Sequence, residues 1–298
     1  MTVSDFFGGA PGPVTVACRI LALSAALFLM PCEQAAARDR NADIAELEKA
    51  LGITETVAIM REEGLSQADN VADALFPDVD RAAWQRQIAQ LYDAERMEKL
   101  VRQGLEAGLE GAELAPMLKF YRSRTGKRAV ALELAARRAL LDPEAEAAAR
   151  EAAAEAAAQT GGPKADLLEQ VMRIIDAGDL IERNVTASLN ADMMFWSGVL
   201  DAGGPGPEGE EGEADLPGAV IADLDATRSE TEIWMTAFLL MSCGSLGAEQ
   251  MKEYVEFYET SEGRKLNAAL FDGFNGMYDQ LAYLLGRAAG SWIISEAL

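Results

Sequence analysis

A nine-residue pattern occurs twice in the chain and constrains the fold more than any other feature. Each copy contains an aromatic pair, a hydroxyl residue, a glycine and two basic residues. The members are Phe120, Tyr121, Ser123, Gly126, Lys127 and Arg128 in the first copy, and Phe257, Tyr258, Thr260, Gly263, Arg264 and Lys265 in the second. Corresponding residues lie 137 positions apart, 257 minus 120. This constant spacing predicts two related halves.

The segment before each copy has the apolar spacing of an amphipathic helix, i, i+3, i+4 and i+7. These apolar positions are Leu114, Met117, Leu118 and Tyr121, and then Met251, Tyr254, Val255 and Tyr258. The correspondence ends downstream, where Glu133 aligns with Leu270. Ser123 and Thr260 are predicted N-caps of the next helix. Gly126 and Gly263 then fall at the third helical position, which predicts close approach of the aromatic pair or a facing helix.

Every other segment with clear periodicity is helical as well, and no stretch alternates convincingly with period two. We therefore predict an all-α protein. Asn41, Thr54, Asp80 and Asp93 are expected N-caps of early helices. The apolar run around Trp234 is expected to form a central core helix that is too short to span a bilayer.

The composition divides the chain into segments. Residues 38–142 form the first predicted helical repeat, and residues 164–298 form the second. Between them, residues 143–163 are rich in Ala and Glu and predict an exposed helical spacer. Residues 202–218 are rich in Gly, Pro and Glu and predict an acidic loop within the second repeat.

Residues 1–37 have the features of an export signal. Arg19 supplies a positive charge, Ile20 to Met30 form an apolar run, and Ala35 to Ala37 offer a cleavage site. We therefore expect a periplasmic protein whose mature chain begins near Arg38 and does not cross the membrane.

Two other interpretations of the N-terminus stay open. One is a buried N-terminal helix. The other is a lipoprotein modified at Cys32, although Pro31 stands where lipid-modified signals carry Gly or Ala. Cleavage after Ala37 would leave Cys243 as the single cysteine, which excludes an intramolecular disulfide. Its apolar neighbours predict a buried, unreactive thiol.

Charge and composition argue against several classes of function. The net charge is −23, so the surface repels nucleic acid and we expect no such partner. The chain has no histidine, which excludes histidine-dependent triads and imidazole zinc sites. The sequence contains no recognisable catalytic constellation, so we expect no enzyme, cofactor or metal. The basic residues of each motif are expected to have carboxylate partners, since they lie at the positive end of a helix.

The motif resembles the signature Phe-Tyr-x-Ser/Thr-x-x-Gly-Lys/Arg of the DUF2059 family, a bacterial family of unknown function. The family usually has proline after the hydroxyl residue, whereas this chain has Arg124 and Ser261 there. The resemblance implies a helical fold and export. It carries no activity and no catalytic residues to this chain.

Three hypotheses for function follow. The first is a non-catalytic periplasmic module that binds a protein, peptide or lipid-like partner. The second is a structural or maintenance role in the cell envelope without a small-molecule site, and the third is a hydrolase that uses carboxylates. For the motif, one interpretation is a binding site in which Tyr121, Tyr258 and the basic pairs contact an anionic or peptide ligand. The interpretation we favour is a helix–turn–helix corner with buried aromatic rings.

Overall fold

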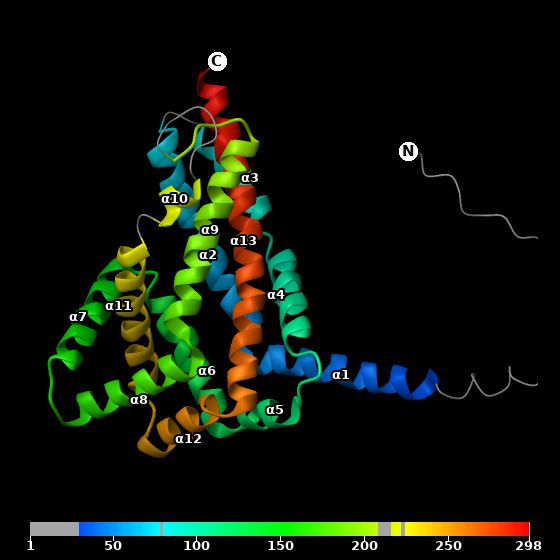
Figure 1. The fold of residues 1–298 in the computed structure, drawn as a ribbon, viewed down its shortest axis with the longest axis vertical. Coiled ribbons are helices and arrows are strands. Elements are labelled where there is room, and N and C mark those ends of the chain that lie inside the picture. The colour runs from blue at the N-terminus through cyan, green and yellow to red at the C-terminus, as the bar shows by residue number, and fades with distance from the viewer. Residues whose placement is uncertain (1–29, 78–79, 208–215, 222–223, 298) are drawn as a thin grey trace, which may run out of the picture. The chain divides into compact units, whose positions relative to one another are not determined.

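The computed structural model describes residues 30–77, 80–207, 216–221 and 224–297 (Figure 1). These residues form thirteen helices and no strand, so the predicted all-α class is confirmed. The described residues from Asp43 onward form one compact unit. In the described part of the chain, no helix combines the length and the apolar composition needed to cross a membrane.

The first helix begins earlier than expected. Helix α1 spans Met30–Leu51, so Asn41 lies inside it and does not cap it. A run of Gln, Ala and Arg precedes Asn41, and these residues continue a helix without a break. The proposed cleavage site at residues 35–37 lies within α1, whereas most of the apolar run of the export signal lies outside the described residues.

Helix α2 (Ile53–Leu75) follows α1 after a single residue. Gly52 makes this corner with a φ of 66°, a left-handed conformation that glycine adopts without strain. The expected cap Thr54 therefore lies inside α2, and its hydroxyl donates a hydrogen bond to Glu98 at 3.3 Å. The prediction failed because the glycine turn, and not a side-chain cap, starts the helix.

Two predicted caps are confirmed. Asp80 caps α3 (Arg81–Leu91) and accepts hydrogen bonds from the backbone amides of Ala82 and Ala83, each at 3.1 Å. Asp93 caps α4 (Ala94–Gly108) and accepts one from the amide of Arg96 at 2.9 Å.

The remaining helices complete the unit. Their bounds are α5 Ala115–Arg122, α6 Arg124–Ala139, α7 Pro143–Ala157, α8 Pro163–Gly178, α9 Leu180–Asp201, α10 Leu216–Ile221, α11 Leu224–Cys243, α12 Ala248–Tyr258 and α13 Ser261–Ala297. The long helix α13 runs beside α4 and α9 (Figure 1). A Cβ atom on Gly273 would lie 2.7 Å from the carbonyl oxygen of Val101, so α13 and α4 nearly touch through their backbones.

Two helices differ from their predicted surroundings. Helix α7, the expected exposed spacer, packs beside α11 and buries Ala153 and Ala156 (Figure 1). Helix α11, the expected central helix, leaves Ile233 and Met241 exposed. Helix α11 packs against the core from one side. Helix α13 is more central, since it supplies buried residues to the two largest apolar clusters of the described residues.

Buried apolar side chains form three clusters, and each combines residues from both sides of Gly162. Val57 and Met277 share the first cluster. Leu118 and Leu266 share the second, and Ala129 and Val171 share the third. The two-half architecture stays a prediction. If there are two halves, each of these clusters contains residues from both of them.

Candidate functional site

The two copies of the motif meet at their first aromatic residues. The rings of Phe120 and Phe257 stack in parallel, with centroids 4.0 Å apart and planes 1° apart. Tyr121 packs edge-on against both rings, at 5.1 Å from Phe120 and 5.5 Å from Phe257. Edge-to-face and stacked rings of this kind stabilise a core beyond the area they bury. The repeat therefore builds one aromatic cluster from two distant segments.

Each corner is capped as predicted. The Ser123 hydroxyl accepts a hydrogen bond from the amide of Gly126 at 3.0 Å, and the Thr260 hydroxyl accepts one from Gly263 at 2.9 Å. A Cβ atom on Gly126 would lie 2.3 Å from the carbonyl oxygen of Phe120, and the equivalent distance at Gly263 is 2.0 Å. The glycines are needed because the aromatic residue's own backbone lies against the start of the next helix.

The basic pairs do not have the partners we expected. Lys127 and Arg128 are exposed and form no ion pair with a carboxylate of the described residues. Arg264 donates to the backbone carbonyl of Glu259, and Lys265 donates to that of Glu110 at 3.1 Å. Backbone carbonyls at nearby helix ends take the place of carboxylates, because those ends carry partial negative charge.

A carboxylate that the sequence did not single out lies beside the aromatic cluster. Glu133 on α6 accepts a hydrogen bond from the Tyr254 hydroxyl, which lies 3.5 Å from the Tyr258 hydroxyl. Burial raises the pKa of Glu133, while the hydrogen bond from Tyr254 opposes that shift. One feature of the sequence could have pointed to Glu133: it is charged, whereas Leu270, the residue 137 positions later, is apolar.

Cys243, on α11, is buried as predicted. Burial raises the pKa of its thiol to about 12, so the sulfur stays protonated and unreactive near neutral pH.

An open groove of ≈690 Å³ lies beside the first corner, and we call it the motif groove. Its walls come from the last turns of α1, the α1–α2 corner, the end of α5 and the first turns of α6. The lining residues are Ala45, Glu46, Lys49, Ala50, Gly52, Glu55, Tyr121, Arg122, Lys127, Val130, Ala131 and Leu134.

The motif groove combines an apolar floor with a polar rim. Val130 and Leu134 contribute to the floor. The Arg122 guanidinium donates to the Glu46 carboxylate at 2.7 Å, so these two charges are paired. Lys49 and Lys127 are exposed and form no ion pair with any described residue. Glu55, on the same rim, is exposed and also forms no ion pair with a described residue, so the lining has three basic and two acidic side chains and a net charge of +1.

The Tyr121 side chain is the most distinctive group in the motif groove. It is 6% exposed, and its hydroxyl forms no hydrogen bond with any described residue. Burial raises the pKa of this hydroxyl well above its ordinary value, so it stays protonated. Because Tyr121 lines the open groove, a ligand or water there can be the partner of its hydroxyl.

The structure distributes the predicted binding residues over three places. Those in the motif groove are Tyr121 and Lys127. Those in the aromatic cluster or its caps are Phe120, Ser123, Gly126, Phe257, Tyr258, Thr260 and Gly263. Those on the surface outside the motif groove are Arg128, Arg264 and Lys265. A binding role for them stays a prediction.

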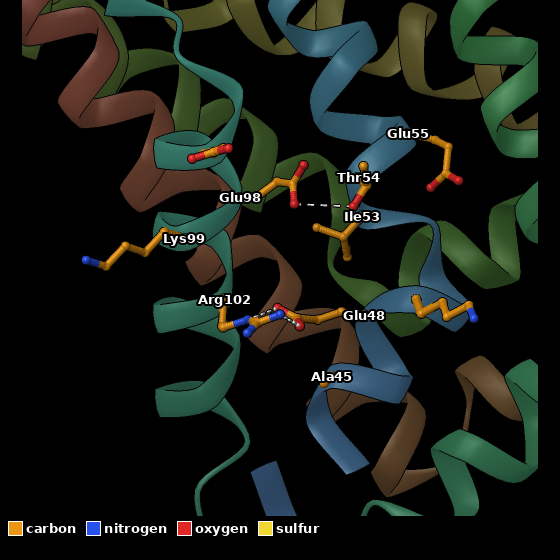
Figure 2. A pocket seen from close by; sticks show the side chains of 10 residues that line it. Ala45, Glu48, Ile53, Thr54, Glu55, Glu98, Lys99 and Arg102 are labelled. Carbon is orange, nitrogen blue, oxygen red and sulfur yellow. Dashed lines mark hydrogen bonds and ion pairs between the residues drawn. The ribbon is translucent and has the colours of Figure 1, made fainter. Parts of the chain in front are cut away.

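A second cavity, of ≈520 Å³, lies on the other side of the α1–α2 corner, facing α4 (Figure 2). Figure 2 shows Arg102 reaching Glu48, with its Nε 2.9 Å from Oε1, and Thr54 facing Glu98. Arg102 and Glu48 satisfy each other, whereas Lys49, Glu55, Glu95 and Lys99 of the same lining form no ion pair with a described residue. Glu48 had no signal of its own in the sequence, because its partner Arg102 lies 54 residues away along the chain.

Comparison with known proteins identifies one family. Residues 95–155 match the family model described as "Uncharacterized protein conserved in bacteria (DUF2059)". No curated protein and no solved structure matches the chain. The matched segment covers most of α4, all of α5 and α6 and most of α7, including the first motif copy, Tyr121, Lys127 and Glu133. The second motif copy lies outside it. The resemblance inferred from the motif is therefore confirmed for the first copy, since residues 95–155 match the DUF2059 family model.

Proposed function

We propose that this protein is an exported, non-catalytic binding module whose ligand occupies the motif groove. The ligand we propose is a single-chain amphiphile with an anionic head group, such as a fatty acid. The observation that carries the proposal is the Tyr121 hydroxyl, which forms no hydrogen bond with a described residue and lines a groove together with two lysines that form no ion pair.

The floor of the groove suits an alkyl chain. Val130, Ala131 and Leu134 offer apolar surface along one face of α6, and Ala45 and Ala50 face it from α1. Each buried methylene group contributes about 0.8 kcal/mol. A volume of ≈690 Å³ falls within the range of small-molecule sites, about 300 to 1,000 Å³.

The rim suits the head group. A ligand carboxylate between Lys49 and Lys127 would be attracted by both ammonium groups. The Tyr121 hydroxyl would donate a hydrogen bond to the same carboxylate. The start of α6, where Lys127 lies, adds the partial positive charge of a helix N-terminus to the same region. These features favour an anion over a cation or a neutral head.

Export and compartment rest on the sequence. The charged, apolar and small-residue regions of residues 1–37 support a cleaved signal and a periplasmic location. A role in envelope structure or maintenance, without a small-molecule ligand, is the alternative.

Titration with decanoate tests the proposal. We expect saturable binding of decanoate by calorimetry, and binding of uncharged decan-1-ol that is weaker by about tenfold, since two charged contacts are lost. Lys49→Gln combined with Lys127→Gln should weaken decanoate binding to the level of the alcohol. Lys119→Gln is the matched control, because Lys119 is exposed on α5 and does not line the groove.

The variant Tyr121→Phe removes the hydroxyl and keeps the ring, so it measures the contribution of the hydroxyl alone. It should weaken decanoate binding by about 2- to 12-fold, the range of one hydrogen bond, while the melting temperature stays within a degree or so of wild type. Equal affinity for decanoate in wild type and in the double lysine variant would refute the motif groove as the site. No saturable binding by either probe would favour the structural role.

A further inference from the structure

A third cavity lies away from the motif groove, among α2, α9 and α13. It has a volume of ≈500 Å³, and we call it the aromatic pocket. Its distinctive lining residues are Tyr92, Phe195, Trp196, Tyr278, Glu63 and Asp192. Four of these are aromatic and two are carboxylates, and no lysine or arginine lines the pocket.

Two glycines permit this arrangement of rings. A Cβ atom on Gly64, in the middle of α2, would lie 2.0 Å from Cε1 of the Tyr92 ring. Glycine inside a helix costs about 1 kcal/mol relative to alanine, and here it makes room for that ring. A Cβ atom on Gly286 would lie 1.9 Å from the carbonyl oxygen of Phe195, so α13 lies close against the turn of α9 that carries Phe195 and Trp196.

The electrostatics of the aromatic pocket favour a positive ligand. Behind the lining, the Arg137 guanidinium pairs with Glu63 at 2.9 Å and donates to the Tyr278 hydroxyl at 3.4 Å, so the charge of Glu63 is balanced. Asp192 is exposed on α9 and belongs to the lining of the same pocket. The faces of aromatic rings are negative, and a cation within about 6 Å of a ring centre is attracted to them.

Tyr92 contributes a polar group from inside the pocket. Its side chain is 6% exposed, and its hydroxyl forms no hydrogen bond with any residue the structure describes. Burial raises the pKa of this hydroxyl to about 12, so it stays neutral near physiological pH. Its oxygen is therefore available to accept a hydrogen bond or to face a positive charge.

We propose that the aromatic pocket binds a small organic ammonium cation. The four rings offer apolar surface to the methyl or methylene groups around the nitrogen, and the cation gains from the ring faces. A compact inorganic cation fits less well, since the described residues contain no cluster of three metal-ligating side chains. An anion would find no opposite charge on the lining.

The test compares choline with 3,3-dimethylbutan-1-ol, which has the same shape without the charge. The full-length protein is titrated with each by calorimetry and by tryptophan fluorescence. We expect saturable choline binding, with the alcohol weaker by about fivefold or more. Trp196→Leu should weaken choline binding by about fivefold as well.

Two further variants make the test specific. Trp234→Leu is the matched control, because Trp234 lies on α11 and does not line the pocket, and it should leave choline affinity unchanged. If Trp196→Leu lowers the melting temperature strongly, Trp196→Phe replaces it and should give a smaller loss of choline affinity. Equal affinity for choline and the alcohol, an equal loss in the Trp234 control, or no saturable choline binding would each overturn the proposal. Decanoate binding at the motif groove is independent of all three outcomes.

Discussion

At the scale of single residues, the glycines of the motif set the geometry of each corner. At Gly126, the carbonyl oxygen of Phe120 lies where a Cβ atom would be. The carbonyl oxygen of Phe257 has the same position at Gly263. A methyl group there would push α6 away from α5 at the first corner, or α13 away from α12 at the second. Either shift would separate the stacked rings of Phe120 and Phe257. The cap hydroxyls of Ser123 and Thr260 bond the amides of these same glycines.

Alanine at either glycine should destabilise the protein. We expect Gly126→Ala and Gly263→Ala each to cost about 1–3 kcal/mol of unfolding free energy, the usual range for overpacking. Urea unfolding gives the measurement. Gly276→Ala is the control, since nothing lies within 4 Å of a Cβ atom there, and alanine in a helix should stabilise by up to about 1 kcal/mol. A stability gain at Gly263 equal to that at Gly276 would rule out the packing role.

Glu133 gives a prediction about pH. Because burial raises its pKa in the folded state, the ionised carboxylate opposes folding, and stability is lost as the pH rises through the folded pKa. Glu133→Gln keeps an oxygen that accepts from Tyr254 and removes the charge. Its melting temperature should exceed that of wild type at pH 8.

The difference at Glu133 should shrink at low pH. Below about pH 4 the wild-type carboxyl is protonated in both folded and unfolded states, so the two proteins should melt alike. Thermal scans between pH 4 and pH 8 make the comparison. A variant less stable than wild type at pH 8 would mean that the ionised carboxylate stabilises the fold.

At the scale of helices, local signals predicted well and long-range ones did not. Asp80, Asp93, Ser123 and Thr260 were identified as caps because a cap depends on residues within a few positions. The corner at Gly52 was missed because Thr54 offered a more familiar cap. The stacking of Phe120 on Phe257 joins segments 137 residues apart, and no local pattern specifies such a contact.

A double-mutant cycle measures that contact between helices. Phe120→Leu and Phe257→Leu should each destabilise the protein, and together they should cost less than the sum. We expect a coupling free energy of about 1 kcal/mol, the range for paired aromatic rings. Phe120→Leu combined with Phe76→Leu is the control pair, since Phe76 belongs to another cluster. Additive costs for Phe120 and Phe257 would contradict the stacking.

At the scale of the molecule, described residues from both sides of Gly162 pack together in each of three buried clusters. The fold class and the corners followed from the sequence, because helical periodicity and caps are local. The motif groove did not, since Lys49 from α1 and Tyr121 from α5 meet only after α1 folds against α5 and α6. Tyr121 and Lys127 were identified in advance, whereas Lys49, Val130 and Leu134 carried no signal of their own.

Native mass spectrometry tests the central claim, an exported module that binds an anionic amphiphile, most directly. The full chain is expressed with its own N-terminus in a Gram-negative host, and the protein is recovered from the periplasm under non-denaturing conditions. We predict a mature chain that begins near Arg38 and carries one small amphiphile, lost on denaturation and absent from the Lys49→Gln, Lys127→Gln variant. A ligand-free protein that also fails to take up added decanoate, or a chain that stays uncleaved in the cytoplasm, would contradict the account.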